Sequence, residues 1–157
     1  MPNMQLVVFQ LGDQYYAVEI DYVNGINKVK DFNIMKVPNA PNFVEGLINL
    51  RGKILPLYNL RKRFFNEDFL SKDNEILVVR MKDIMVGLIV DEVFDIISLE
   101  EKDAEPATNL FLGIDSRFIS HIGKTEDQMI IILDVPNILS QTEQQEITPM
   151  FSTEKAT

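Results

Sequence analysis

The chain has no cysteine and only one histidine among its 157 residues. Without cysteine it cannot form disulfides, and it cannot hold zinc or iron–sulfur clusters through thiolates. The histidine, His121, follows Ser120. Neighbouring side chains on a strand point to opposite faces, so we do not expect these two to form a nucleophile–base pair. These shortages argue against nucleophilic catalysis and against thiolate metal sites.

Glycine is sparse where a cofactor would need it. The seven glycines are scattered, and no two have the spacing of a phosphate-cradling loop. Adjacent carboxylates occur at Asp91-Glu92 and Glu100-Glu101, but paired catalytic acids must converge on one site, which adjacency does not provide. We expect residues 100–105 to form a solvated acidic loop. The sequence therefore predicts no catalytic residue, no metal site and no cofactor, and hence a protein that is not an enzyme.

Long apolar runs, a targeting signal and a basic surface are missing as well. The longest strongly apolar runs, residues 84–90 and 129–133, fall far short of the about 20 residues that a membrane helix needs. The N-terminus has no basic region followed by an apolar stretch, as a secretory signal would. The net charge is −9, and the densest basic cluster, residues 61–63, is expected to be a solvated helix turn. We expect a cytoplasmic protein with no nucleic-acid partner and no direct membrane insertion.

What the chain does contain is strand-forming sequence. Its length suits one compact domain or two small lobes, and Phe, Tyr and β-branched residues favour strands. Short helical turns are expected at residues 59–64 and 134–139, where Asp134 can cap the second. Residues 141–157 are polar and are expected to be a disordered tail. The expected strands are residues 5–11, 15–20, 23–29, 46–50, 53–57, 75–81, 84–90, 93–99, 118–122 and 129–133.

An internal repeat gives the organisation of the chain. Residues 6–26 lie over residues 76–96 without a gap when the sequence is shifted by seventy, and residues 53–60 lie over residues 128–135 at a shift of seventy-five. The repeat predicts two similar small barrels, one spanning about residues 5–65 and the other about residues 75–140. Short antiparallel strands close on themselves to remove exposed edges. Neither half has much core alone, so we expect the two to pack through an apolar seam.

Two features point to surfaces that bind a partner. Apolar residues occupy both faces of several strands, and some of them can line a groove for a partner rather than the seam. The other feature is the proline-stiffened segment 37–46, which leads into the sequence Asn49-Leu50-Arg51-Gly52. Gly52 can supply the positive φ of a hairpin turn, so we expect Arg51 to project from a fixed turn.

These same residues carry a family resemblance. Residues 37–57, with Asn49-Leu50-Arg51-Gly52 intact, are similar to the signature of the CheW family, and residues 87–93 and 133–135 match two further characteristic strands. The chain resembles a single CheW-like domain over residues 5–140. The resemblance implies an all-β fold of two five-stranded, SH3-like barrels packed through an apolar seam, with a short C-terminal helix.

The resemblance also implies partners. CheW proteins are adaptors in bacterial chemotaxis that bind the cytoplasmic tips of methyl-accepting chemotaxis receptors and the regulatory domain of the histidine kinase CheA. A member of this family would be cytoplasmic and recruited to membrane receptor clusters. The residues implied in the receptor contact are Val23, Ile26, Gly46, Leu47 and Arg51, and those implied in the kinase contact are Val93 and Ile96.

One position departs from the family pattern, and two alternatives stay open. Where family members often carry a glutamate that pairs with the signature arginine, this chain has Gly25, so Arg51 would pair with Glu45 or Asp21 or point at the receptor unpaired.

No receiver domain or kinase module is evident, which separates the chain from the related CheV and CheA proteins. A CheW homologue in another pathway such as pilus motility is one alternative. An oligonucleotide-binding barrel is the other, although acidic residues surround the only adjacent aromatic pair in an expected strand, at residues 15–16.

Overall fold

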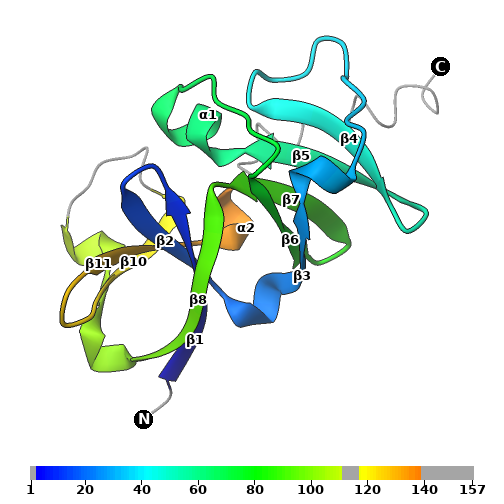
Figure 1. Ribbon diagram of the computed structural model, residues 1–157. Helices are drawn as coiled ribbons and strands as arrows, with labels where there is room; N and C mark the ends of the chain where they lie inside the picture. Colours follow the sequence, from blue (N-terminus) through cyan, green and yellow to red (C-terminus); the bar gives the residue numbers. More distant parts are fainter. Residues whose placement is uncertain (1–2, 111–116, 139–157) are drawn as a thin grey trace.

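The computed structural model describes residues 3–110 and 117–138, and within them the chain is mostly β-strand (Figure 1). The six-stranded sheet has the order β8-β1-β2-β11-β10-β9, and the five-stranded sheet has the order β3-β6-β7-β5-β4. The first sheet consists of β1 (Asn3–Leu11), β2 (Gln14–Glu19), β8 (Glu92–Glu100), β9 (Ala104–Pro106), β10 (Ile119–Lys124) and β11 (Met129–Leu133). The second consists of β3 (Val23–Lys28), β4 (Val44–Leu50), β5 (Lys53–Asn59), β6 (Glu75–Met81) and β7 (Ile84–Val90).

All ten strands expected from the sequence are present, with ends that differ by no more than two residues. The short strand β9 was missed, because it lies at the acidic stretch that was expected to be a loop. The prediction of two closed five-stranded barrels needs correction. One sheet has six strands, and among the described residues no ladder joins its edges β8 and β9, nor joins β3 to β4 in the other sheet. The predicted tail, residues 141–157, lies outside the described residues.

The predicted boundaries of the two lobes are wrong, because the sheets do not divide the chain at its middle. The six-stranded sheet combines the first two strands of the chain with its last four, and the five-stranded sheet takes β3 to β7. Figure 1 shows this directly, since blue and orange ribbons lie together in one lobe and blue-to-cyan and green ribbons in the other. Among the described residues the lobes are therefore 3–22 with 91–110 and 117–138, and 23–90.

The internal repeat is nevertheless present, down to the strand register. The hairpin β1–β2 pairs Val7 with Val18, and β6–β7 pairs Leu77 with Leu88, seventy residues further on. The third strand of each repeat then crosses to the other repeat, where Ile26 in β3 pairs with Leu77 and Ile96 in β8 pairs with Val7. Each sheet is thus built from both repeats, and neither half of the sequence can complete a lobe alone.

The second offset relates β4–β5 to β10–β11 in the same way. Val44 pairs with Tyr58 and Ile119 with Leu133, and a bulge follows at the same place in both ladders. The helices α1 (Leu60–Phe65) and α2 (Val135–Ile138) begin seventy-five residues apart at the ends of these hairpins. The short C-terminal helix predicted from the sequence is therefore confirmed.

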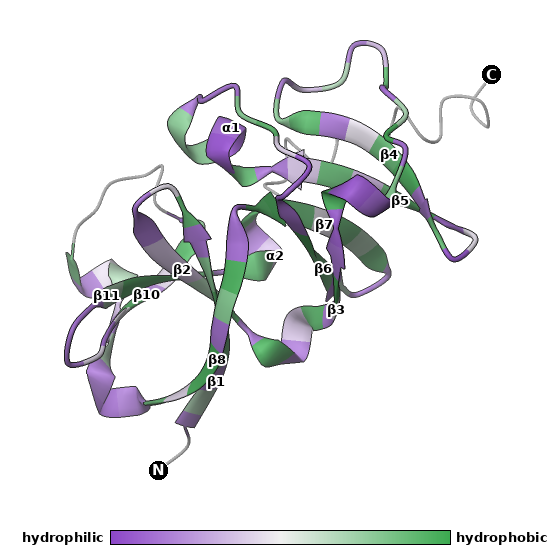
Figure 2. Ribbon diagram, in the orientation of Figure 1, coloured by the Kyte–Doolittle hydropathy of each residue, from purple (hydrophilic) through white to green (hydrophobic). Residues whose placement is uncertain are grey.

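Three clusters of buried side chains hold the sheets together, and the largest is the predicted seam. This central cluster contains residues of both sheets, among them Val7 and Phe9 of β1, Leu77 of β6 and Leu88 of β7. A smaller cluster lies inside each lobe. Figure 2 shows the strands around the seam as largely hydrophobic ribbon, with polar segments at the loops. Burial of apolar area drives this association, at about 25 cal/mol per Å².

Helix α1 is fixed by a capping residue whose side chain is buried. Asn59 is 1% exposed, and its Oδ1 accepts hydrogen bonds from the backbone N–H groups of Arg61 and Lys62. The cap satisfies amides that a helix N-terminus leaves without partners. The helix ends at Asn66, which has a left-handed φ of 56°. No helix among the described residues has the length and apolarity needed to cross a membrane.

Candidate functional site

The strands β3 and β8 form corresponding edges of the two sheets, and both carry residues predicted to bind partners. Ile26 on β3 is 43% exposed and Ile96 on β8 is 54% exposed. Val23 and Val93, at the starts of the same strands, are half-buried and pack against the central cluster. Each predicted pair thus divides into an exposed isoleucine that can touch a partner and a valine that belongs largely to the core.

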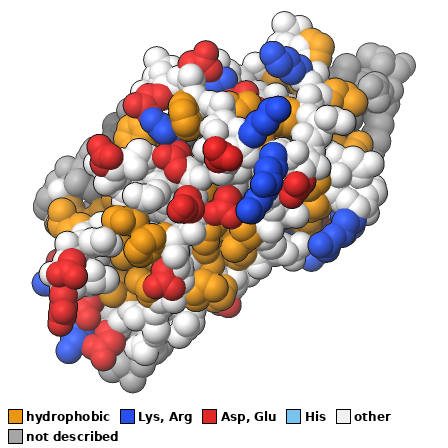
Figure 3. Space-filling view, viewed as in Figure 1, with side chains coloured by type: hydrophobic (Ala, Val, Ile, Leu, Met, Phe, Trp, Pro, Cys, Tyr) orange, Lys and Arg blue, Asp and Glu red, His pale blue; other side chains and the backbone are white. Residues whose placement is uncertain are grey.

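The two edges differ most at one bulged position. Phe94 on β8 is 55% exposed and its ring lies 5.0 Å from that of Tyr15, whereas the corresponding residue of β3 is Asn24. Sequence reasoning missed Phe94, although comparing the repeats position by position would have found it. Beside it, Asp95 takes the place that Gly25 has in the first repeat. The β8 edge is consequently apolar and acidic, and Figure 3 shows apolar side chains gathered over this part of the molecule with acidic ones around them.

This difference extends to whole lobes. Residues 23–90 contain eleven Lys and Arg against seven Asp and Glu, a net charge of +4. Residues 1–22 and 91–138 contain three against fourteen, a net charge of −11. Such a separation gives the two parts of the chain net charges of opposite sign, and charge of this kind steers association more than it adds affinity.

Gly46 and Leu47 lie on β4, at the opposite edge of the five-stranded sheet from β3. Leu47 forms a two-way backbone bridge with Met35: its N–H donates to Met35 O at 2.7 Å and its O accepts from Met35 N–H at 2.8 Å. Gly46 has a φ of +147°, and a Cβ there would lie 2.2 Å from Met35 O. Gly46 is buried, so its primary role in the structure is to let the chain cross closely over β4.

Arg51 projects from a fixed turn, as predicted. It is exposed, it has a φ of 51°, and the Oδ1 of Asn49 accepts a hydrogen bond of 2.7 Å from the Gly52 N–H. Neither of the two acids predicted as alternative partners, Glu45 and Asp21, pairs with it, and within residues 3–110 and 117–138 Arg51 forms no ion pair. The five residues predicted for the receptor contact therefore form two groups, one on β3 and one on β4 and its turn.

Glu45 does not reach Arg51 because it is held by helix α1. Its Oε2 lies 3.0 Å from Lys62 Nζ and accepts a hydrogen bond of 2.7 Å from the Asn59 side chain, which also donates to Phe69 O. Lys62 also contacts Asp68 at 3.1 Å. Burial alone would lower the pKa of Lys62, but its hydrogen bonds to these two carboxylates raise that pKa above the ordinary value for lysine.

The basic cluster at residues 61–63 is not the solvated turn that the sequence predicted. Arg61 is only 19% exposed, and it pairs with Glu67 at 2.9 Å and with Asp91 at 3.2 Å. Its guanidinium also stacks 4.2 Å from the ring centroid of Phe69. Asp91 in turn accepts a hydrogen bond of 2.8 Å from the Gly12 N–H in the β1–β2 turn. This chain of contacts ties helix α1 of one lobe to a hairpin of the other.

Ser120 and His121 lie closer together than the sequence predicted. A bulge in β10 breaks the alternation of the strand, and His121 Nδ1 is 3.0 Å from Ser120 Oγ. The serine hydroxyl also donates to Ile132 O at 3.2 Å, so a backbone carbonyl, and not only the imidazole, lies in reach of its proton. The arrangement is that of a structural contact. Among the described residues no group of three potential ligands could hold a metal ion.

Comparison with known proteins identifies the class of protein. The family model described as a CheW-like domain matches residues 5–143, so the chain belongs to the CheW family. Chemotaxis proteins CheW of Treponema pallidum and Helicobacter pylori are 33% and 34% identical to it, over 92% and 88% of this chain and 87% and 82% of the relatives. The resemblance predicted from the sequence is confirmed.

A solved structure supports the fold as well as the family. The crystal structure of the scaffolding protein TtCheW from Thermoanaerobacter tengcongensis superposes with a TM-score of 0.76 at 40% identity, covering 85% of this chain and 90% of the other. The protein PilI of Pseudomonas aeruginosa is 31% identical, but only over 87 residues, 55% of this chain and 48% of PilI. The relatives therefore favour a chemotaxis scaffold over the pilus-motility alternative.

Proposed function

We propose that this chain is a non-catalytic adaptor that couples the cytoplasmic tips of methyl-accepting chemotaxis receptors to the regulatory domain of the histidine kinase CheA. It would work in the cytoplasm and be recruited to receptor clusters at the membrane through these contacts. Membership of the CheW family supports the role in chemotaxis signalling. The proposal of two partners rests on one observation: β8 and β3 are equivalent edges of the two sheets, and they carry different residues.

The β8 edge is the proposed kinase contact. Ile96 and Phe94 together expose apolar area on an edge strand, which offers backbone groups and side chains to a partner. Aromatic and aliphatic side chains at the centre of an interface contribute most of its binding energy. Val93 supports this surface from below, since its N–H donates to Glu75 Oε1 at 2.6 Å and its side chain packs on the central cluster.

The five-stranded lobe is the proposed receptor contact. Ile26 supplies exposed apolar area, and Arg51 supplies a guanidinium on a rigid turn that can pair with a carboxylate of a receptor helix. Leu47 lies next to the Met35 bridge, and Met35 is 67% exposed. In this arrangement Gly46 and Val23 contribute by shaping the backbone and the core.

A crossed experiment tests the proposal. Titration calorimetry would measure the binding of the kinase regulatory domain and of a soluble receptor-tip hairpin, both from the same organism, to the wild type and to two variants. Ile96→Glu should weaken kinase binding by at least about tenfold, which corresponds to about 1.4 kcal/mol, and leave receptor binding unchanged. Ile26→Glu, at the equivalent position of the other repeat, should weaken receptor binding and leave kinase binding unchanged. Arg51→Glu should have the same effect as Ile26→Glu.

Each variant is the matched control for the other, because both replace an exposed isoleucine on an edge strand. If the wild type binds neither partner, the coupling proposal is wrong. If it binds both but the two variants lower both affinities equally, the assignment of partners to edges is wrong. Circular dichroism would verify that each variant keeps the fold.

A further inference from the structure

Two hairpin turns at one end of the five-stranded sheet carry exposed cations together with exposed isoleucines. Strand β5 runs parallel to β7, so the β4–β5 turn and the β6–β7 turn lie at the same end of the sheet. In Figure 1 the closed ends of both hairpins lie at the lower right of this lobe. Ile54 is 73% exposed and Ile84 is 38% exposed. The charged residues within 50–54 and 80–84, all exposed, are Arg51, Lys53, Arg80 and Lys82 and one acid, Asp83.

The cations at the two turns stand where a side chain is costly for the backbone. Four described residues other than glycine have a positive φ, among them Arg51 at 51° and Lys82 at 55°. The other two, Asn39 and Asn66, are of the type that tolerates this conformation best. In the first repeat the position equivalent to Lys82 is Gly12, with a φ of 62°. The turn can therefore be made with glycine, and the backbone alone does not account for the lysine.

Both turns are braced by side-chain hydrogen bonds. The Gly52 N–H donates to Asn49 Oδ1 at 2.7 Å, and Arg80 Nε donates to the carbonyl oxygen of Lys82 at 3.2 Å. Within residues 3–110 and 117–138, neither Arg51 nor Lys82 forms an ion pair. A partner that binds here would meet turns that are already ordered, which lowers the entropy cost of association.

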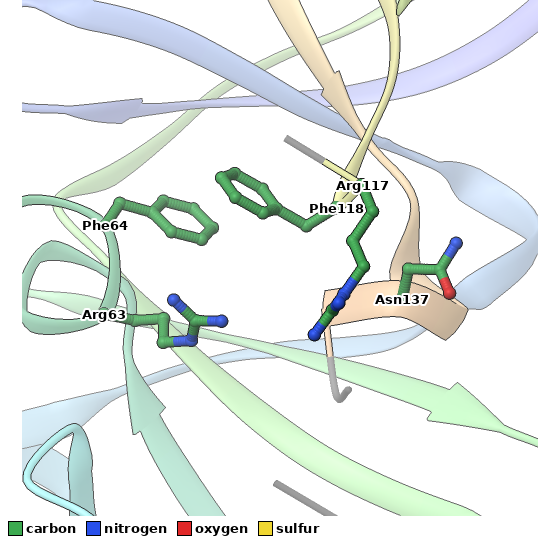
Figure 4. A pocket seen from close by; sticks show the side chains of 5 residues that line it. All are labelled: Arg63, Phe64, Arg117, Phe118 and Asn137. Carbon is green, nitrogen blue, oxygen red and sulfur yellow. The ribbon is translucent and has the colours of Figure 1, made fainter. Parts of the chain in front are cut away.

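The cations of helix α1, in the same lobe, are placed differently. Arg61 and Lys62 each contact two carboxylates. Figure 4 shows Arg63 beside the ring of Phe118, whose centroid lies 6.0 Å from the guanidinium carbon. These side chains lie against the body of the protein, whereas the cations of the two turns extend from the end of the sheet.

The equivalent end of the six-stranded sheet has the opposite charge. At a shift of seventy, residues 82–83 correspond to Gly12-Asp13, and at a shift of seventy-five, residues 51–52 correspond to Glu126-Asp127. These turns also share one end of their sheet, because β2 and β11 run parallel. One arrangement of turns is thus basic in one lobe and acidic in the other. An acidic partner would be attracted to the first and repelled by the second.

The β6–β7 turn also lies between the two groups of residues assigned to the receptor contact. Strands β6 and β7 separate β3, which carries Ile26, from β5 and β4, which carry the turn with Arg51. Asn24 at the start of β3 reaches toward this end of the sheet, where its Nδ2 lies 3.8 Å from Met85 Sδ. A partner that touches both groups must therefore pass over the β6–β7 turn.

We propose that Lys82 is a further receptor-binding residue, and that the two turns together hold an acidic segment of the receptor's helical tip. The guanidinium of Arg51 binds a carboxylate in a defined orientation, while the ammonium of Lys82 attracts a second one with less geometric demand. Ile54 and Ile84 then face the apolar side of the segment. This role of Lys82 rests on the proposed coupling function, since Arg51 belongs to the proposed receptor contact.

Titration calorimetry with a soluble receptor-tip hairpin from the same organism tests the role of Lys82. Lys82→Glu should weaken receptor binding by at least about tenfold, because it places like charges opposite each other. Lys82→Gly, which introduces the residue of the first repeat, should weaken it about threefold and suits the positive φ. Lys72→Glu is the matched control: it changes an exposed lysine before the opposite end of β6, alters the net charge equally, and should bind as the wild type does.

Ionic strength provides a second measurement. Raising it from about 0.01 M to about 0.15 M shortens the Debye length from about 30 Å to about 8 Å. Receptor affinity should fall over this range in the wild type and in Lys72→Glu, and fall less in Lys82→Gly. Binding of the kinase regulatory domain should be the same in the wild type and in the Lys82 variants, and circular dichroism verifies their fold.

The outcomes separate this role from the coupling function itself. If the wild type binds the receptor tip and Arg51→Glu weakens that binding but Lys82→Glu does not, the role of Lys82 is overturned and the coupling function stands. An equal loss in Lys72→Glu also overturns it, since net charge would then be the cause. A wild type that does not bind the receptor tip overturns both. If Lys82→Glu abolishes sedimentation with phosphatidylglycerol vesicles and leaves receptor binding intact, the turns bind an anionic lipid surface and the receptor assignment is wrong.

Discussion

Replacing Gly46 with alanine tests why this position of the family signature carries no side chain. An added Cβ would lie 2.2 Å from Met35 O and 2.8 Å from Ile34 Cγ2, so the segment that crosses β4 must move. The backbone φ of +147° is also one that alanine rarely adopts, at a cost of about 1–3 kcal/mol. Moving Met35 would break its two hydrogen bonds with Leu47, each contributing about 1 kcal/mol.

Together these effects predict a loss of about 3–5 kcal/mol, reduced by up to about 1 kcal/mol because alanine restricts the unfolded chain more than glycine does. Urea unfolding followed by circular dichroism measures the difference. Gly25→Ala is the matched control, because its added Cβ would meet only Asn27 Oδ1, at 4.0 Å, and its φ lies outside the left-handed region. We expect this control to be within about 1 kcal/mol of the wild type.

If Gly46→Ala is as stable as Gly25→Ala, the close crossing of Met35 over β4 is not what excludes a side chain, and the reasoning fails. The result also bears on binding. If Gly46→Ala is stable and still loses receptor affinity, the loss points to a direct contact of Gly46 with the receptor. If the variant is destabilised as predicted, a displaced backbone explains the loss.

Two further predictions concern the link between lobes and a buried phenol. Asp91→Ala removes the acceptor of Gly12 N–H and the partner of Arg61, so the free energy of unfolding should fall by about 2–3 kcal/mol in urea titrations; an unchanged midpoint would contradict the link. Burial raises the pKa of Tyr16 to about 12, so its phenol stays protonated in the folded state, and the stability it confers is complete below pH 10 and lost as the pH rises from about 10 to about 12. Ultraviolet titration of phenolate formation should show a late-titrating component near pH 12 that is missing in Tyr16→Phe.

Much of the fold could be predicted because strand formation and register are encoded locally. Alternating and continuous apolar runs located every long strand. The offset of seventy residues predicted two similar units, and their hairpins have equal registers in the pairs Val7–Val18 and Leu77–Leu88. The lobe boundaries could not be predicted in this way. The third strand of a repeat can fold back on its own hairpin or cross to the hairpin of the other repeat, depending on which pairing buries more apolar area. The sequence pattern of the repeat is the same in both cases.

The contacts of long charged side chains could not be predicted from the sequence either. Arg61 and Asp91 are thirty residues apart, and only the exchanged strands bring α1 beside the β1–β2 turn that Asp91 caps. The bulge in β10 likewise reverses the expected relation between Ser120 and His121, because one extra residue shifts the following side chains to the other face. Ile26 and Ile96, by contrast, were predicted to lie in strands, and β3 and β8 confirm this; their roles in binding stay predictions.

The exchange of strands has a consequence for coupling. The β8 edge is anchored on β1 and the β3 edge on β6, and Val7 and Leu77, the residues that pair with Ile96 and Ile26, both belong to the central cluster. The two proposed contacts are therefore attached to one shared core. Protein interiors are close-packed and have low compressibility, so they transmit strain. If the two partners bind at these edges, the core between them would hold both in a fixed relative orientation and pass a shift of one to the other as a rigid-body movement.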